Sequence, residues 1–270
     1  MPGMAPPPVV LTIAGFDPSS GAGVTADLRT LAAHGCYGVA CITALTVQST
    51  RGVRRMLPLP GRLVRQTLDE LAADFKLAGV RVGMLGSAEV ARAVRRFLES
   101  LGGLCPVVLD PILRATSRAQ LLEARGLPEL RRMIPLATVI TPNLAEASAL
   151  AGMRVSNLEQ MRSAAQRLHR LGASNVVITG GHLRQPVDLV SMDLGGDRWR
   201  QIEFRGKRVP GVSTHGTGCA FATALAARLA RGRPLEKAVA ESKQYVAVAL
   251  GRARPLGRGA KLLGPFLPWP

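Results

Sequence analysis

Residues 9–34 read VVLTIAGFDPSSGAGVTADLRTLAAH. The run that ends at Gly15 is apolar and too short for a helix, which is typical of a buried strand. A polar loop containing glycine follows, and Leu28 and Leu31 then recur at helical spacing. A strand joined to a helix by a short loop is the repeating unit of a parallel α/β sheet, so this stretch indicates the fold class.

The same alternation continues along the chain. Further strands are predicted at residues 38–46, 80–84, 106–109, 138–141 and 175–179. Helices are predicted at residues 87–101, 121–133, 144–151, 158–171, 217–230 and 235–250. The pattern favours a three-layer α/β/α fold with a mostly parallel central sheet. Because no linker or repeat interrupts it, we expect one domain over residues 1–270, with flexible tails at residues 1–8 and 252–270.

The chain is strongly basic. Its 270 residues include 35 Lys and Arg, of which five are Lys, against 18 Asp and Glu, and the formal net charge is +17. Such a charge attracts nucleic acids, anionic lipids and phosphorylated small molecules alike. The arginines are scattered, without interleaved aromatic residues and without a DNA- or RNA-binding motif. We therefore expect a solvated basic surface and no specific nucleic-acid partner.

The cysteines and the apolar segments favour a cytoplasmic location. Cys36, Cys41, Cys105 and Cys219 show neither metal-ligand spacing nor a disulfide framework, which fits a reducing compartment. Residues 1–8 contain prolines in place of the basic and apolar regions of a secretory signal. No apolar run reaches the roughly 18 residues that a spanning helix needs, so we expect no membrane contact.

Ligands of open parallel sheets bind at the carboxyl ends of the strands, so residues that follow strands are the candidates for a site. Residues 141–146 read TPNLAE and follow a predicted strand. Asn143 and Glu146 lie three residues apart at a helix start, where such a pair can hold a hydrated Mg²⁺ beside ATP phosphates. The spacing fits an N-cap asparagine with a capping-box glutamate equally well, and the pattern alone favours this second interpretation.

Residues 214–219 read THGTGC and precede an alanine-rich helix. Gly216 and Gly218 allow successive backbone N–H groups to point inward, and the helix N-terminus adds partial positive charge. Together they form a candidate cradle for a transferred phosphoryl group. A thiol at a helix N-terminus, such as Cys219, is expected to have a lowered pKa. An ordinary glycine-rich helix start with a small buried residue remains an alternative.

One common nucleotide-binding motif matches only weakly, and another is missing. The stretch GAGVTA (residues 21–26) is separated from its strand by FDPSS and lacks the acid that a dinucleotide site needs about 20 residues on. Lys207 is followed by Arg208, so a Walker loop is missing. Asp110 at a strand end and Gln48 among Thr and Ser are further candidates, although a turn and a solvated loop explain them too.

Taken together, these segments resemble the hydroxymethylpyrimidine and phosphomethylpyrimidine kinases of thiamin synthesis over residues 9–250. The stretches that carry the resemblance are TIAGFDPSSGAG (12–23) with Asp27, ITALTVQSTRG (42–52), GMLG (83–86), DP (110–111), TPNLAE (141–146), GGH (180–182) and THGTGC (214–219). The number and order of these stretches make the match specific. No single stretch would do so.

The resemblance implies a ribokinase-like α/β/α fold and a homodimer. It implies phosphate transfer from ATP to the hydroxymethyl oxygen of 4-amino-5-hydroxymethyl-2-methylpyrimidine, and then to the resulting monophosphate. In the family, the residue matching Gln48 bonds the pyrimidine. The residues matching Gly15, Ala22 and Met84 line its pocket.

The resemblance also assigns the phosphate side of the site. Gly216, Thr217 and Gly218 match the anion hole, and Cys219 stands where related sugar kinases carry an aspartate base. The ATP and Mg²⁺ side is expected to comprise Asp110, Asn143, Glu146 and Thr179, with Glu146 reaching Mg²⁺ through water.

The chain departs from the usual family pattern at four positions. Phe16 stands where Thr or Ser is common at the pocket rim, and Ser20 and Arg118 stand where glycine is usual. Thr179 replaces a common lysine close to ATP. These departures concern substrate range and nucleotide affinity more than the type of reaction.

Three alternatives stay open. Pyridoxal or pyridoxine kinase activity is the nearest, because that substrate is also a six-membered heteroaromatic with a hydroxymethyl group. A catalytically silent pyrimidine-binding regulator on the same fold is disfavoured by the intact GTGC stretch with Asn143 and Glu146. A nucleic-acid-binding protein is disfavoured by the dispersed arginines.

Overall fold

A mostly parallel sheet runs through the computed structural model, which describes residues 6–115, 119–181, 183–206 and 214–264. Within these ranges the sheet has nine strands in the order β3-β2-β1-β4-β5-β6-β7-β8-β9. The parallel strands are β1 (Val9–Phe16), β2 (Tyr37–Ser49), β4 (Leu77–Val82), β5 (Val107–Leu109), β6 (Val139–Ile140) and β7 (Asn175–Ile178). The antiparallel edges are β3 (Gly52–Pro58), β8 (Val187–Asp193) and β9 (Trp199–Arg205).

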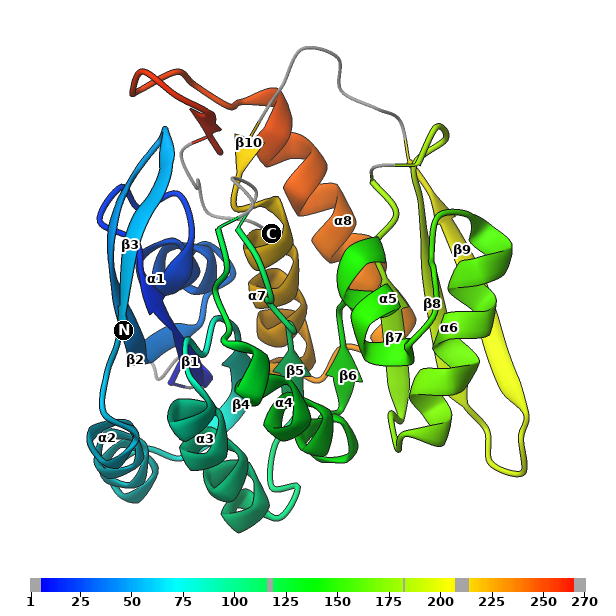
Figure 1. Ribbon diagram of the computed structural model, residues 1–270, viewed down its shortest axis with the longest axis horizontal. Coiled ribbons are helices and arrows are strands. Elements are labelled where there is room, and N and C mark those ends of the chain that lie inside the picture. The colour runs from blue at the N-terminus through cyan, green and yellow to red at the C-terminus, as the bar shows by residue number, and fades with distance from the viewer. Residues whose placement is uncertain (1–5, 116–118, 182, 207–213, 265–270) are drawn as a thin grey trace.

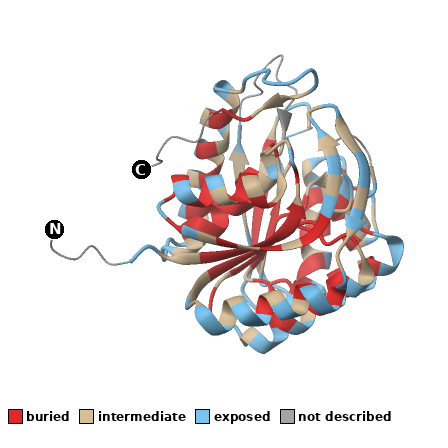
Figure 2. Cartoon of the chain, turned by 90° about the vertical axis from the view of Figure 1, so that its left-hand side faces the viewer, coloured by how far each residue is buried: buried red, intermediate tan, exposed pale blue. Residues whose placement is uncertain are grey.

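Helices cover both faces of the sheet (Figures 1 and 2). One layer contains α1 (Gly23–Ala33), α7 (Thr217–Ala230) and α8 (Leu235–Gly251). The other contains α2 (Gly61–Asp74), α3 (Ala88–Leu101), α4 (Leu127–Met133), α5 (Leu144–Ala151) and α6 (Leu158–Arg170). The predicted three-layer α/β/α fold is confirmed. Among the described residues, no helix combines the length and apolar character needed to cross a membrane.

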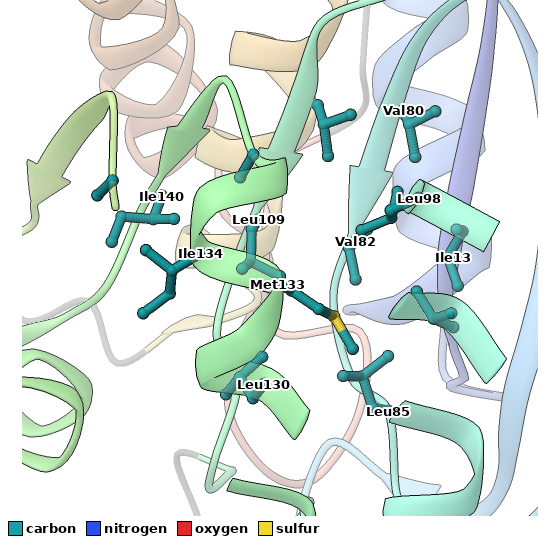
Figure 3. Packing of buried hydrophobic residues seen from close by; sticks show 14 of the residues in the cluster. Ile13, Val80, Val82, Leu85, Leu98, Leu109, Leu130, Met133, Ile134 and Ile140 are labelled. Atoms are coloured by element: carbon teal, nitrogen blue, oxygen red, sulfur yellow. The ribbon is translucent and has the colours of Figure 1, made fainter. Parts of the chain in front are cut away.

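Strand residues alternate between the two cores, because successive side chains point to opposite faces of a sheet. Val108 packs on the α7 side with Phe221, whereas Leu109 packs on the opposite side with Met133. Figure 3 shows Met133 extending from α4 toward Leu85. Both faces of the central strands are apolar, which explains why their sequences read as continuous apolar runs.

The order of the strands locates the site. The chain moves from β1 to β2 on one side and later returns to place β4 on the other side of β1. In open parallel sheets the ligand crevice lies where the order reverses, at the carboxyl ends of the strands. The residues just after β1, β4 and β5 are therefore the ones that the topology gathers.

Two segments differ from their predictions. The helix expected at residues 121–133 begins only at Leu127, with Pro128 in its first turn, where a missing N–H costs nothing. Residues 253–264 are not the free tail expected after residue 251. Strand β11 (Lys261–Leu262) pairs in parallel with β10 (Thr214–His215), and Leu263 is buried against α7 and α8.

Two leucines near β5 test this description of the core. Leu109 is 1% exposed and Leu104 is 84% exposed. Leu109→Ala should lower the free energy of unfolding by about 2–5 kcal/mol, because the variant loses buried apolar contacts and leaves a cavity. Leu104→Ala should change it by about 0.5 kcal/mol or less. Urea titration of both variants measures this, and equal effects would contradict the assignment of Leu109 to the core.

Candidate active site

The Asp17 carboxylate organises the loop between β1 and α1. It accepts hydrogen bonds from the Ser19 N–H at 2.8 Å, the Ser19 hydroxyl at 2.7 Å and the Ala22 N–H at 3.0 Å. Gly23 then has φ +63°, and a Cβ there would lie 2.2 Å from the Gly15 carbonyl oxygen. The loop therefore folds back over the end of β1, and only glycine fits at its end.

Of the four residues predicted to hold the pyrimidine, three lie at or just after the ends of strands and one lies at the start of a helix. Gly15 and Met84 are in contact, since a Cβ on Gly15 would lie 2.4 Å from the Met84 Cε. Ala22 is the N-cap residue of α1. Gln48 is half-buried on β2, and its Oε1 accepts a hydrogen bond from the Thr46 hydroxyl at 3.2 Å.

The glycine-rich loop lies directly against this region. Gly216 has φ +87°, and a Cβ there would lie 1.9 Å from the Gly21 carbonyl oxygen. The N–H groups of residues 217–219 lie in the first turn of α7 and therefore have no intrahelical partner. No side chain of the described residues caps them either. A Cβ on Gly218 would meet nothing within 4 Å. Packing within the chain leaves the backbone at Gly218 open to a ligand.

A buried network of charged and hydroxyl side chains connects the elements that form this region. Arg81 of β4 is 0% exposed and donates to Asp27 at 3.1 Å and to Asp110 at 2.7 Å. Asp27 also accepts hydrogen bonds from Thr12 of β1 at 2.7 Å and Thr223 of α7 at 2.8 Å. The network therefore fixes α1, β1, β4, α7 and the end of β5 relative to one another.

Cys219 touches the same network. Burial raises the pKa of its thiol to about 12, although a hydrogen bond and the charge from Arg81 act in the opposite direction. The nearby carboxylates of Asp110 and Asp27 raise it further. The expectation that the helix N-terminus gives Cys219 a lowered pKa is therefore wrong for the chain without ligands, because desolvation and two neighbouring carboxylates outweigh the helix.

The nucleotide-side candidates meet at the start of α5. The Asn143 side chain accepts from the Ala145 and Glu146 N–H groups at 2.9 and 3.0 Å, and Glu146 accepts from the Asn143 N–H at 2.9 Å. This is the capping box that the spacing also predicted. The Thr179 N–H donates to the Pro142 carbonyl at 2.9 Å, so Thr179 lies beside Asn143.

Two carboxyl groups near this helix start are unusually hard to ionise. Burial raises the pKa of Asp110 to about 6, although Arg81 lowers it. Burial raises the pKa of Glu146 to about 8, with a further contribution from the charge of Asp110. Buried carboxylates with too little positive charge around them suit a hard cation such as hydrated Mg²⁺. No cluster of three or more His, Cys, Asp or Glu able to hold a metal directly occurs in the described part of the chain, so water would complete such a site.

The departures from the family pattern have different structural settings. Ser20 adopts φ +56°, the left-handed region in which glycine carries no strain, which gives a reason for glycine at this position. Phe16 and Thr179 are both half-buried. Arg118 lies outside the described residues, as does His182 of the GGH stretch.

Comparisons with known proteins decide the family. A family model described as phosphomethylpyrimidine kinase matches residues 17–264. The chain belongs to this family. A hydroxymethylpyrimidine/phosphomethylpyrimidine kinase from Aquifex aeolicus is 37% identical over 256 residues, which cover 94% of this chain and 99% of that protein. The bifunctional thiamine biosynthesis protein ThiED of Geobacter sulfurreducens is 43% identical over 93% of this chain, which spans only 50% of that protein.

Solved structures of related kinases have the same fold as this chain. Phosphomethylpyrimidine kinase from Clostridium difficile superposes with a TM-score of 0.75 at 31% identity, covering 89% of this chain and 98% of that one. An ADP complex of Bacillus subtilis pyridoxal kinase gives a TM-score of 0.86 at 30% identity, covering 96% and 97%. The chain thus shares its fold with kinases of both classes, and structural likeness alone does not decide between them.

The sequence did not reveal that Arg81 and Asp17 organise the candidate site. Arg81 stands in the apolar stretch LAGVRV of β4, and a charged residue inside a strand that is buried on both faces is the signal for it. Asp17 precedes a proline and reads as an ordinary turn residue. Its three bonds to the loop appear only in the fold.

Glu146 makes the stability of this kinase depend on pH. Its pKa is about 8 in the folded chain and 4.5 in an unfolded one, so the unfolded chain releases this proton first as pH rises. The contribution to stability is complete below pH 4.5 and is lost as pH rises through about 8. Between pH 4.5 and about 8, the free energy of unfolding of Glu146→Gln should therefore fall less steeply than that of the wild type, by up to ~1.4 kcal/mol per pH unit.

Gln also suits a capping box, so the helix start should survive this substitution. Urea titrations in chelator-containing buffers across the window measure the slope. The control Glu159→Gln makes the same change in the first turn of α6, where Glu159 is exposed. If Glu146→Gln and the wild type have equal slopes, the raised pKa is wrongly assigned to Glu146.

Proposed function

We propose that this chain transfers the γ-phosphoryl group of ATP to 4-amino-5-hydroxymethyl-2-methylpyrimidine, and then to the resulting monophosphate, for thiamin synthesis. The observation that carries the proposal is the contact between Gly216 and Gly21. It sets the open N–H groups of α7 beside the loop that borders Gly15 and Met84. The names of the Aquifex and Geobacter relatives support the pyrimidine as substrate.

The catalytic task is positioning and charge stabilisation, as in phosphoryl transfer generally. The pyrimidine would be oriented by Gly15, Ala22, Met84 and the Gln48 amide. Its hydroxymethyl oxygen would face residues 216–218, called the anion loop here. The N–H groups of Thr217, Gly218 and Cys219 would accept the charge that develops on the transferred phosphoryl oxygens.

The nucleotide side would be formed by Asp110, Asn143, Glu146 and Thr179. Asp110 and Glu146 would hold Mg²⁺ through water, and that ion supplies neutralisation of phosphate charge. Asn143 keeps the start of α5 in place through its cap, and the Pro142 to Thr179 bond aligns the neighbouring strand end.

Cys219 has a thiol that is neutral at rest, and the two reaction steps ask for different protonation states of it. The first step attacks with a neutral hydroxyl whose proton must leave, and we assign Cys219 to receive it as a thiolate, after the thiol has given its own proton to water. The second step attacks with a phosphate monoester, which is already ionised. A neutral thiol does not repel this second substrate, whereas a fixed carboxylate would.

We further propose a cytoplasmic homodimer. Leu45, Val47 and Leu57 are 43%, 58% and 52% exposed, and Leu45 faces Leu57 in the register of β2 and β3. A second copy of the chain would cover this apolar face of the hairpin. The four cysteines are all free thiols, as the reducing cytoplasm maintains them.

Pyridoxal kinase activity is the rival function, favoured by the TM-score of 0.86 to the Bacillus subtilis enzyme. Both substrates present a hydroxymethyl group on a heteroaromatic ring, so the glycine-rich loop serves either. The family match and the curated relatives favour the pyrimidine.

Steady-state kinetics with both alcohols as competitors tests the proposal. We expect kcat/KM for the pyrimidine to exceed that for pyridoxal by about tenfold or more. Gln48→Leu should raise the KM for the pyrimidine by an amount equivalent to about 1–3 kcal/mol, because ring donors or acceptors lose their partner. Gln66→Leu, at an exposed position of α2, is the control. Faster turnover of pyridoxal would reverse the assignment.

Substitutions of Cys219 distinguish the two steps. Cys219→Ser should slow phosphorylation of the alcohol more than that of the monophosphate, because only the first step needs a proton acceptor. Cys219→Asp should retain appreciable first-step activity and hinder the second through repulsion. Separate assays that start from each substrate measure this. Cys36→Ser, which changes a buried thiol packed against α7 near Ala227, should leave the ratio of the steps unchanged. Equal losses in both steps would show that Cys219 only packs.

A further inference from the structure

Residues 253–264, called the strap here, form a loop anchored on α7 and α8. The Arg254 N–H donates to the Leu262 carbonyl at 2.9 Å, and the Leu262 N–H returns the bond at 3.0 Å. The Gly264 N–H donates to the Ala249 carbonyl at 3.1 Å, and Leu263 is buried. In Figure 1 the strap lies at the same end of the molecule as β10, above α7.

One side of the strap holds the tip of the β2–β3 hairpin. The Gly259 N–H donates to the Thr50 hydroxyl at 3.1 Å, and the Ala260 N–H donates to the Thr50 carbonyl at 2.8 Å. A Cβ on Gly257 would lie 2.4 Å from the Thr50 hydroxyl oxygen, and one on Gly259 would lie 2.1 Å from the Thr50 carbonyl oxygen. Gly259 is therefore required by the close approach of two backbones, and Gly257 by the close approach of the Thr50 side chain.

The other side of the strap holds the strand that enters the anion loop. In the parallel pairing of β10 and β11, Thr214 is opposite Lys261 and His215 is opposite Leu262. Gly216, the N-cap residue of α7, follows β10 without any intervening residue. Residues 257–262 thus contact both Thr50, which stands two residues after Gln48, and the strand next to Gly216.

We propose that the strap couples the two halves of the site, with Thr50 and Gly259 as positioning residues. When the hairpin closes on a pyrimidine, Thr50 moves the strap, and β11 moves β10 and the anion loop with it. Each ligand then strengthens the binding of the other, because both favour the same arrangement of one connected segment. The inference rests on the proposed function, since that function assigns the two halves their ligands.

Calorimetry tests the coupling directly. The affinity for the pyrimidine alcohol is measured alone and with a saturating β,γ-methylene analogue of ATP, and the affinity for the analogue is measured alone. In the wild type the analogue should strengthen pyrimidine binding by about fivefold or more, the lower end of typical coupling between sites. In Gly259→Ala this ratio should fall to within about twofold of one, while each ligand alone keeps an affinity within about threefold of the wild type.

Two further variants make the result interpretable. Thr50→Val keeps the branched shape of the side chain and removes the acceptor for Gly259, so it should lower the ratio without adding an atom to the side chain. Gly251→Ala adds a Cβ that meets nothing within 4 Å at the end of α8, and it should keep the wild-type ratio.

A wild-type ratio of one, or the wild-type ratio retained in both Gly259→Ala and Thr50→Val, would overturn the inference. Weaker binding of both single ligands at an unchanged ratio would reveal a merely structural strap and would overturn it too. If the wild-type chain binds the analogue but no pyrimidine, the proposed function itself is wrong, which is a distinct result.

Discussion

The buried Arg81 guanidinium is the contact on which the rest of the site depends. It is fully enclosed between Asp27 and Asp110, and Asp27 in turn holds Thr12 and Thr223. Burial alone would lower the pKa of Arg81, but the two carboxylates raise it above its usual value, so the charge persists inside the fold. A complete buried network contributes little net stability, whereas removing one partner typically costs about 3–5 kcal/mol. The network therefore selects one arrangement of strands and helices and penalises every other.

This arrangement also restricts the backbone around it. A Cβ on Gly83 would lie 1.9 Å from an Arg81 guanidinium nitrogen, so the chain after β4 has room only for glycine. Arg81 also reaches Cys219 in the first turn of α7, directly after the anion loop. The side chain that orders the interior therefore also fixes where α7 begins. The open N–H groups of α7 and the end of β1 at Gly15 keep their separation because both elements are tied to one buried charge.

Periodicity and the rule for parallel sheets predicted much of the molecule, because both depend on local patterns. Three parts escaped. Arg81 finds Asp27 across 54 positions, a pairing that only the assembled sheet creates. The segment after residue 251 is rich in glycine, proline and arginine and reads as a tail, yet its bonds to Thr50 span 209 positions. The pKa of Cys219 followed desolvation and neighbouring carboxylates, which no sequence window contains.

The distribution of charge explains how a chain of net charge +17 can have an acidic centre. Among the described residues the buried acids are Asp17, Asp27, Asp110, Glu129 and Glu146, and all but Glu129 lie at the site. Surface arginines are screened within about 8 Å at physiological salt, so they steer anions without balancing the interior. At the site, Arg81 faces Asp27 and Asp110. Protons hold part of the remaining charge, because the pKa values of Asp110 and Glu146 are raised. Such a centre favours a phosphate that arrives with its own cation over a bare one. A neutral Cys219 is consistent with this balance, because a further fixed negative charge beside the anion loop would oppose the group being transferred.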